Sequence, residues 1–215
     1  MRYFVIKAEK VSKKFSHRQG IENISFEVEP GEIFGLLGND HAGKSTLVSL
    51  LAGYFRPSSG NLMAFGLDCQ RNARQIRERV GFYPGNHPSR SRHTVAEILR
   101  SQGYQPGGIL WTDIQKLADK LDLDLAQPAA TLSTHDRQVF DLLQAFIPRA
   151  ELLILDEPTY ELKPAIQDVF YRLIAEAREE GRTVFITSRS LAEMERLCDR
   201  VAIMHRGKLV AIERG

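Results

Sequence analysis

The chain has few of the features that mark a secreted or membrane-spanning protein. Only two of its 215 residues are cysteines, Cys69 and Cys198, and they lack the spacing of a zinc site, so no disulfide scaffold is expected. Its longest apolar runs are short, such as residues 152–155, and its first residues show neither a signal peptide nor a membrane span. We therefore expect a cytoplasmic protein, for which any role at a membrane depends on another subunit.

An excess of charge of one sign is also missing. The 29 Lys and Arg residues nearly balance the 27 Asp and Glu residues, and the two signs are interleaved along the chain. The sequence therefore predicts no basic surface and no nucleic acid partner. With 43% hydrophobic residues, 16 glycines and 9 prolines, the composition is typical of a soluble globular protein. The length fits a single domain, residues 1–215, with room for an inserted lobe.

Hydrophobic patterning predicts two kinds of sheet. Ile24, Phe26 and Val28 alternate with polar residues, which indicates a half-buried strand in an antiparallel β lobe near the N-terminus. The continuous apolar runs at residues 33–37, 152–155 and 184–187 instead predict buried strands of a parallel sheet.

Helices are predicted between these strands. A helix is expected at residues 45–52, ended by Gly53, and another after Pro164, ended by Gly181. Residues 94–147 hold three helical patterns with no strand between them, so we interpret them as an inserted helical lobe. Two pairs have the spacing of a capping box, and each predicts a helix start: Thr112 with Gln115, and Ser190 with Glu193.

Residues 38–45 match the phosphate-loop pattern GxxxxGK[ST], and the match lies between a predicted buried strand and a predicted helix. Glycines in such a loop let backbone N–H groups meet phosphates at the positive end of the helix. We expect Lys44 to contact the β- and γ-phosphates and the Ser45 hydroxyl to bind Mg²⁺. The loop residues predicted to bind the nucleotide are Gly38, Asn39, Asp40, His41, Ala42, Gly43, Lys44, Ser45 and Thr46.

Two carboxylates follow the buried run at residues 152–155. Asp156 is the second predicted ligand of Mg²⁺, because such a site needs a carboxylate at the end of a neighbouring strand. Glu157, one residue further, is the predicted catalytic residue, a general base that polarises the attacking water.

Four stretches resemble one family in order and spacing: residues 31–38 with the phosphate loop, 131–133, 152–159 and 197–204. Over essentially its whole length the chain is similar to the nucleotide-binding domain of ABC transporters, and residues 65–68 and 80–84 look most like the drug and polysaccharide exporter subfamily. The resemblance implies an α/β fold with a P-loop NTPase (RecA-like) core, an antiparallel β subdomain and an inserted α-helical subdomain at about residues 94–147. It also implies ATP and Mg²⁺ as cofactors.

The same resemblance assigns further roles. Phe15 falls where the family stacks an aromatic ring on adenine, although a core phenylalanine at a strand end remains an alternative. Ser133 and His135 fall in the signature that closes over the nucleotide of the opposite subunit in a head-to-tail dimer. The implied partners are transmembrane transporter subunits and a second ATP-binding subunit, in a homodimer or a heterodimer. Residues 85–92 and 94–99 are the implied contact with the membrane subunit, at the inner face of the cell membrane.

Four accessory motifs depart from the family pattern. Gly85 stands where the family has Gln, and Arg189 stands where it has the switch His. Thr134 and His135 replace two signature glycines, Asp136 follows them, and residues 160–163 replace the usual D-loop. Side chains in place of glycines are expected to weaken closure over ATP. Protonated His135 and the permanently charged Arg189 are candidates to contact the γ-phosphate instead.

Two functions therefore remain open. The first is an ATP-hydrolysing subunit that couples dimerisation to export by membrane subunits, and Glu157 favours it. The second is a catalytically weakened ATP-binding subunit with a regulatory or structural role, which the altered accessory motifs favour.

Overall fold

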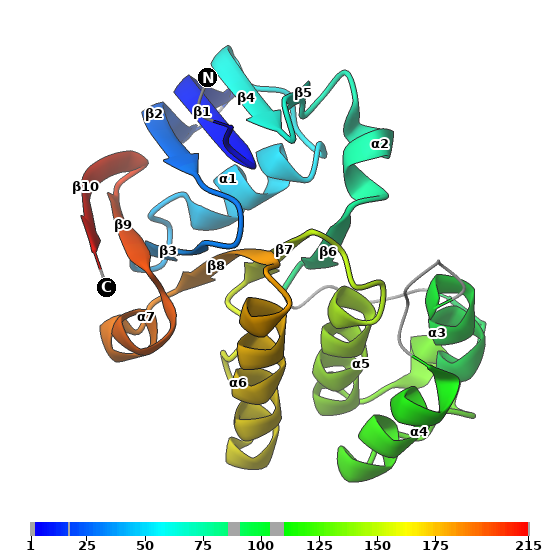
Figure 1. Ribbon diagram of the computed structural model, residues 1–215. Helices are drawn as coiled ribbons and strands as arrows, with labels where there is room; N and C mark the ends of the chain where they lie inside the picture. Colours follow the sequence, from blue (N-terminus) through cyan, green and yellow to red (C-terminus); the bar gives the residue numbers. More distant parts are fainter. Residues whose placement is uncertain (1–2, 17, 86–90, 104–109, 215) are drawn as a thin grey trace.

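The computed structural model describes residues 3–16, 18–85, 91–103 and 110–214. Two sheets are present: an antiparallel one in the order β2-β1-β4-β5 and a larger one in the order β10-β9-β3-β8-β7-β6 (Figure 1). The strands are β1 (Ile6–Phe15), β2 (Arg18–Val28), β3 (Ile33–Leu37), β4 (Ser59–Ala64), β5 (Leu67–Asp68), β6 (Val80–Tyr83), β7 (Leu152–Asp156), β8 (Thr183–Ser188), β9 (Arg200–His205) and β10 (Lys208–Arg214). The helices are α1 (Lys44–Leu51), α2 (Ala73–Arg77), α3 (Val95–Gly103), α4 (Trp111–Lys120), α5 (Thr134–Phe146), α6 (Pro164–Glu179) and α7 (Leu191–Leu197), with a short 3₁₀ helix at Ala129–Thr131.

The larger sheet is parallel from β9 through β3, β8 and β7 to β6, and β10 joins its edge antiparallel to β9. Its central strands are buried on both faces, which explains their continuous apolar runs. In β7, Leu152 and Ile154 pack with α1 and the antiparallel sheet, whereas Leu153 and Leu155 pack with the helices of the opposite face. The predicted mixed α/β architecture is confirmed, and the carboxyl ends of β3, β6, β7 and β8 lie at one edge of the sheet (Figure 1).

The expected elements outside the sheet core are present with small shifts in their bounds. Helix α6 begins with Pro164 and buries one apolar stripe, and Gly181 follows it in the left-handed region at φ 70°. The members of the stripe are the predicted ones: Ile166, Val169, Phe170, Leu173, Ile174 and Ala177. Three α-helices and the short 3₁₀ helix fall within the described part of residues 94–147, and the last of them, α5, lies against β6 of the parallel sheet.

The two expected capping boxes have different outcomes. The Thr112 and Gln115 prediction is wrong, because the N-cap of α4 is Leu110, two residues before Thr112, and it has no side-chain cap. Ser190 caps α7 as predicted, accepting a hydrogen bond from the Glu193 N–H. The Glu193 carboxylate, however, accepts from the Ser188 hydroxyl at 2.5 Å instead of closing the box on Ser190.

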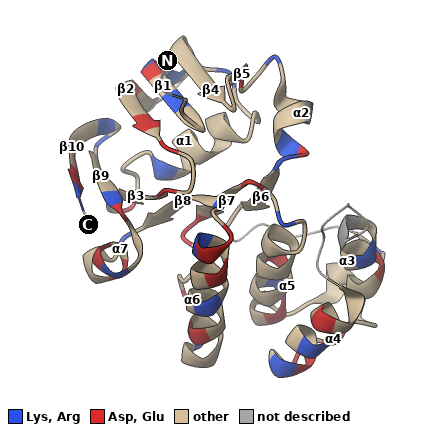
Figure 2. Ribbon diagram, in the orientation of Figure 1, with Lys and Arg blue, Asp and Glu red and all other residues tan. Residues whose placement is uncertain are grey.

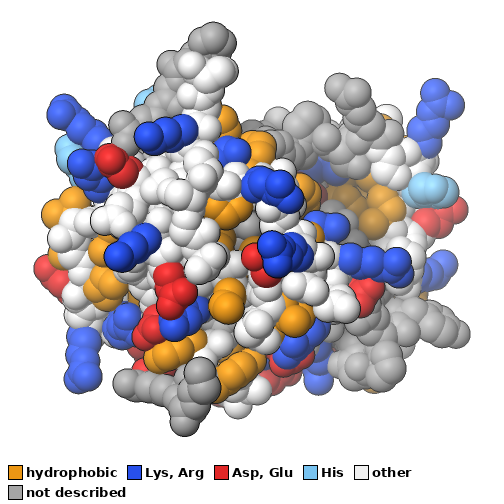
Figure 3. Space-filling model, turned by 90° about the horizontal axis from the view of Figure 1, so that it is seen from above, with side chains coloured by type: hydrophobic (Ala, Val, Ile, Leu, Met, Phe, Trp, Pro, Cys, Tyr) orange, Lys and Arg blue, Asp and Glu red, His pale blue; other side chains and the backbone are white. Residues whose placement is uncertain are grey.

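Charged residues of both signs cover the outside of the fold. Acidic and basic residues alternate along α4 and α6 (Figure 2). On the face seen in Figure 3, basic side chains are spread over the surface with acidic ones between them. Within the part of the chain that the structure describes, every helix is too short or too polar to span a bilayer.

Asp141 on α5 is an acidic residue inside this fold. Its side chain is buried, and its Oδ1 accepts a hydrogen bond from Gln144 Nε2 at 3.1 Å. Burial raises the pKa of the Asp141 carboxyl to about 7, and the charge of Arg137 and the Gln144 hydrogen bond oppose that rise only in part. Between the unfolded pKa of 3.8 and the folded pKa of about 7, Asp141 is therefore protonated in the folded protein and ionised in the unfolded chain.

The substitution Asp141→Asn tests this burial. A carboxyl with a raised pKa stabilises the fold below its unfolded pKa of 3.8, and this stability is lost as the pH rises through about 7. We expect the variant to match the wild type near pH 4 and to exceed it at pH 8, by on the order of a few kcal/mol. Urea unfolding of both proteins across this pH range measures the gap. A gap that stays constant between pH 4 and 8 would contradict the prediction.

Candidate functional site

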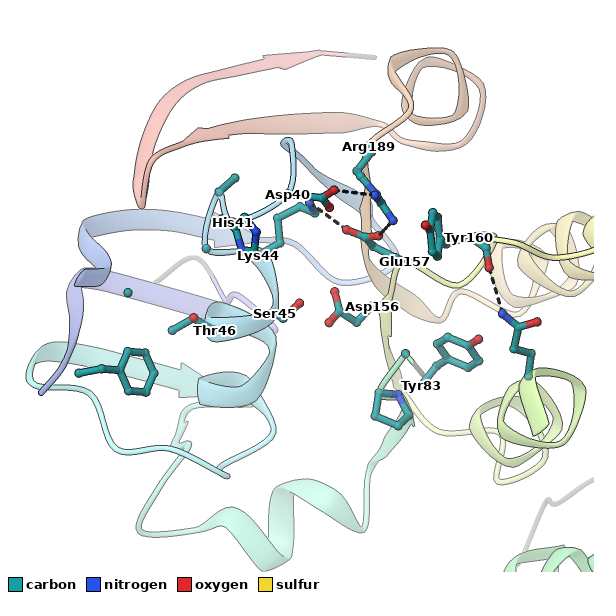
Figure 4. Close-up of a pocket in the computed structure, with 17 residues that line it drawn as sticks. Asp40, His41, Lys44, Ser45, Thr46, Tyr83, Asp156, Glu157, Tyr160 and Arg189 are labelled. Atoms are coloured by element: carbon teal, nitrogen blue, oxygen red, sulfur yellow. Dashed lines mark hydrogen bonds and ion pairs between the residues drawn. The ribbon is translucent and has the colours of Figure 1, made fainter. Parts of the chain in front are cut away.

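A cavity of about 890 Å³ lies where the carboxyl ends of the parallel strands meet (Figure 4). Most of the residues predicted from the sequence line it: Phe15, Asp40, His41, Ala42, Gly43, Lys44, Ser45, Thr46, Asp156, Glu157 and Arg189. The cavity is also lined by residues that were not among the predicted nucleotide-binding residues, namely Gly20, Tyr83, Pro84, Gln138 and Tyr160. No local pattern marks Gln138, which enters from α5 and donates through Nε2 to the Tyr160 carbonyl at 3.1 Å.

The phosphate loop joins β3 to α1 and is tightly packed. Gly43 has φ 106°, and a Cβ on it would lie 2.7 Å from Ile21 Cγ2. A Cβ on Gly38 would lie 2.8 Å from the Met204 carbonyl oxygen, so both positions require glycine. Gly43 caps α1 without a side-chain hydrogen bond, and the first turn of the helix carries no acidic residue. The backbone N–H groups at this helix start are therefore free of a competing side-chain cap, which suits phosphate binding.

Lys44 is buried in the loop, with 4% of its surface exposed. Its Nζ donates to the carbonyl oxygens of Gly38 at 2.5 Å and Asn39 at 3.1 Å, and it lies 2.9 Å from Glu157 Oε1. These three oxygens compensate the ammonium charge where water is largely excluded. Gly38 and Asn39 do not line the cavity, so their direct contribution to the site is to hold Lys44.

Asp156 and Ser45 place oxygen atoms side by side on the cavity wall (Figure 4). Burial raises the pKa of the Asp156 carboxyl, and hydrogen bonds from Thr187 and Ser45 oppose the rise. Among the described residues no group of three or more His, Cys, Asp or Glu side chains could hold a metal ion alone. One carboxylate and one hydroxyl fit Mg²⁺, which commonly takes its remaining oxygen ligands from water and substrate phosphates.

Glu157 has an unusual backbone for its residue type, with φ 48° in the left-handed region. The Thr187 hydroxyl supports this conformation, because it accepts from the Glu157 N–H at 3.0 Å and donates to Asp156 Oδ1 at 2.7 Å. The turn directs the Glu157 carboxylate into the cavity, where Oε1 meets Lys44 and Oε2 lies 2.8 Å from Arg189 Nη2 (Figure 4). Local strain of this kind is characteristic of functional positions.

Phe15 also lines the cavity. It is half-buried, its ring meets Phe55 edge to face at 5.6 Å, and Lys13 Nζ lies 5.4 Å from the ring centre. A Cβ on Gly20 would lie 2.8 Å from the Phe15 ring, so glycine there leaves room for the aromatic side chain. The position beside an open cavity supports base stacking over a core role.

The residues predicted as the signature lie outside this cavity. Ser133 is the N-cap of α5: its Oγ accepts from the Asp136 N–H at 3.1 Å and donates to Asp136 Oδ2 at 2.6 Å. Asp136 therefore serves the helix start. His135, in the first turn of the same helix, is also absent from the cavity lining.

Gly85 follows β6 at the cavity wall in a left-handed conformation, φ 74°. A glutamine with this backbone would be strained, so the loop here is built for glycine. The predicted membrane-subunit contact includes residues 86–90, which lie outside the described residues.

The substitution Thr187→Val tests the support beneath the two carboxylates. Valine keeps the shape of the fully buried Thr187 but removes the hydroxyl that bonds to Asp156 and Glu157. We expect the free energy of unfolding to fall by about 1–3 kcal/mol, because a buried carboxylate and a backbone N–H lose a partner. Denaturant unfolding measures the loss, and Thr187→Ser, which retains the hydroxyl, is the control. A Val variant as stable as the wild type would contradict this role.

Comparison with known proteins identifies the family. The family model described as ABC transporter matches residues 21–160. The bacitracin transport ATP-binding protein BcrA of Bacillus licheniformis is 30% identical, and the match covers 96% of this chain and 68% of BcrA. The linearmycin resistance ATP-binding protein LnrL of Bacillus subtilis is 30% identical over 97% of this chain and 68% of LnrL. The probable multidrug ABC transporter ATP-binding protein YbhF of Escherichia coli is 32% identical over 96% of this chain.

The chain spans only 36% of the length of YbhF and about two thirds of the other two relatives. Solved structures share its fold. A structure described as the ATP-binding subunit of an ABC transporter superposes with a TM-score of 0.86 at 24% identity, covering 98% of this chain and 90% of that one. The ATP-binding cassette MJ0796, bound to ADP and phosphate, gives a TM-score of 0.82 at 17% identity over 97% of this chain and 98% of that one. With the phosphate loop and the two carboxylates in place around one cavity, the chain belongs to the ATP-binding proteins of the ABC transporter family.

Proposed function

We propose that this chain binds and hydrolyses MgATP as the ATP-binding subunit of an ABC exporter. The observation that carries the proposal is the position of Glu157, whose carboxylate faces the same cavity as Lys44, Ser45 and Asp156. A subunit that only binds nucleotide does not require a carboxylate here, directed inward by a left-handed turn. The same cavity is lined by Phe15, the phosphate loop, Asp156 and Glu157, which supports a site for a base, phosphates and an attacking water together.

Each wall of the cavity has a separate task. Phe15 stacks on adenine, and the N–H groups of the phosphate loop and α1 bind the phosphates. Ser45 and Asp156 hold Mg²⁺, which when bound supplies positive charge to the phosphate oxygens. Glu157 accepts a proton from the water that attacks the γ-phosphate.

Lys44 links nucleotide binding to this base. Before nucleotide binds, its Nζ lies 2.9 Å from Glu157 Oε1. A triphosphate carries more negative charge than one carboxylate and attracts the ammonium toward the β- and γ-phosphates. The movement of Lys44 frees Oε1 to accept a proton, so the base becomes available when substrate is present.

Export and partnership follow from the relatives and from the place of the signature. Relatives are named for bacitracin transport, linearmycin resistance and Nod factor export. Ser133 and His135 lie at the start of α5 and do not line the chain's own cavity, which is compatible with a role at the nucleotide of a second subunit. We propose a head-to-tail homodimer or heterodimer at the cytoplasmic face of the membrane, held there by transmembrane subunits near Gly85 and residues 91–99.

Phosphate release from MgATP tests hydrolysis. We expect turnover per chain to rise with protein concentration as dimers form, and Glu157→Gln to lower kcat by at least about 100-fold, the usual contribution of a general base. Lys44→Ala is the control for lost nucleotide binding, whereas Glu157→Gln should still bind ATP. Wild-type turnover no higher than that of Glu157→Gln would instead indicate a subunit that binds ATP without using it.

Equilibrium binding of MgATP tests the base site. We expect Phe15→Ala to weaken binding about 10-fold, because stacking of a base on an aromatic ring contributes about 1–3 kcal/mol. Phe15→Trp, which retains an aromatic face, should bind within about threefold of the wild type by the same reasoning. If Phe15→Ala binds as the wild type does, adenine stacks elsewhere and Phe15 is part of the core.

A further inference from the structure

Asp40 reaches from the phosphate loop across the cavity mouth to Arg189, which follows β8 (Figure 4). Arg189 Nη1 lies 2.9 Å from Asp40 Oδ2, and its Nη2 lies 2.8 Å from Glu157 Oε2. The Tyr160 ring covers the guanidinium plane at 3.9 Å. Two segments that are distant in sequence, the phosphate loop with Asp40 and the turn after β7 with Glu157 and Tyr160, therefore hold the Arg189 guanidinium.

The contacts leave Arg189 charged and oriented. Burial lowers the pKa of the Arg189 guanidinium, but interactions with Tyr160, Glu157 and Asp40 outweigh it and raise the pKa overall. A guanidinium with a carboxylate on each terminal nitrogen and a ring on its face has little rotational freedom. Arg189 is only 30% exposed, whereas the Asp40 carboxylate is 64% exposed and faces solvent at the rim.

A carboxylate in a phosphate loop is unfavourable for binding an anion unless a cation accompanies it. Without nucleotide, Asp40 and Glu157 occupy the two terminal nitrogens of Arg189 that a phosphate would use for a bidentate contact. A γ-phosphate must therefore displace these carboxylates to reach Arg189. ADP ends one phosphate earlier and leaves the Asp40–Arg189 contact intact, so the contact opposes ATP more than ADP.

We propose that Asp40 is a specificity-determining residue that holds Arg189 in place of a γ-phosphate and thereby lowers the preference of the site for ATP over ADP. The inference rests on the proposed MgATP site and assigns to Asp40 a role that phosphate binding alone does not require. Loss of the Asp40 charge should release Arg189 to the γ-phosphate and leave the ADP complex nearly unchanged.

The experiment compares the affinities of ADP and of a non-hydrolysable ATP analogue, each with Mg²⁺. Both displace a fluorescent ADP from the full chain, at a protein concentration where light scattering shows monomer. Asp40→Asn should raise the ratio of ATP-analogue affinity to ADP affinity about three- to fivefold, the range of a partly exposed ion pair. Asp40→Glu, which retains the charge, should keep the wild-type ratio.

A double-mutant cycle with Arg189→Gln separates the contact from simple repulsion. In the Arg189→Gln background, Asp40→Asn should leave the ratio unchanged. An equal or larger rise in that background would overturn the proposal, because Asp40 would then act on the nucleotide directly. A fall in the ratio with Arg189 present would also overturn it, since Asp40 would be presenting Arg189 to the phosphate.

Glu22→Gln provides the matched control for net charge. The Glu22 carboxylate pairs with Lys208, and the Glu22 N–H donates a hydrogen bond to the Gly207 carbonyl. The Gly207 N–H donates in turn to the carbonyl of Ala42 in the phosphate loop. The substitution Glu22→Gln therefore removes one negative charge near the loop without changing a contact of Arg189. The ratio of ATP-analogue affinity to ADP affinity should stay at its wild-type value. If the wild type binds neither nucleotide, the proposed function is wrong and the role of Asp40 is wrong with it. If the wild type binds both nucleotides and Asp40→Asn leaves the ratio of ATP-analogue affinity to ADP affinity unchanged, only the role of Asp40 is wrong.

Discussion

The parallel pairing of β7 with β8 places Asp156 opposite Thr187, and the cavity depends on this register. Side chains alternate between the faces of a strand, so a slip of one residue would turn Asp156 away from Ser45 and toward the opposite face. The Thr187 hydroxyl secures the arrangement from inside by bonding to the Asp156 side chain and the Glu157 backbone. Because Glu157 follows Asp156 and Arg189 follows Thr187 by two residues, the same register brings a carboxylate and a guanidinium within 2.8 Å.

Much of the fold and part of the site could be predicted from the sequence, for a physical reason. The phosphate loop is a local structure, because its glycines, its lysine and the helix that follows are contiguous in the sequence. The spacing of these residues is therefore enough to predict the conformation of the loop. The apolar stripe of α6 and the buried strands are local in the same sense. The roles of Thr187 and Gln138 arise only when separate elements pair, and no short pattern encodes that. The false capping pair at Thr112 shows the opposite failure, since correct spacing cannot say where the chain enters a helix.

The residues that the sequence analysis expects to depart from the family pattern have defined contacts or backbone conformations in the structure. Ser133 and Asp136 form a side-chain cap on α5, so the segment predicted as the signature starts its helix with a satisfied N–H group. Gly85 adopts a backbone that a glutamine would not share without strain. Arg189 does not stand alone in the place of a histidine, because Asp40, 149 positions away, and Tyr160 both contact it. Arg189 and Tyr160, both predicted to depart from the pattern, thus contact one another and form one local structure with Asp40.

This solution changes how a general base at Glu157 would be released. Without nucleotide both carboxylate oxygens are occupied, Oε1 by Lys44 and Oε2 by Arg189. A histidine at position 189 could give up its proton near neutral pH and so lose its hold on the base, but an arginine keeps its charge. Under the proposed function, displacement would free Glu157, because bound phosphate groups would attract both cations away from its carboxylate. Lys44 lies within the phosphate loop, so any bound phosphate chain attracts it. Arg189 lies at the mouth of the cavity, where the Asp40 carboxylate also attracts it. Full release of the base would then require the longer, more highly charged nucleotide, and this links the chemistry at Glu157 to the presence of a γ-phosphate.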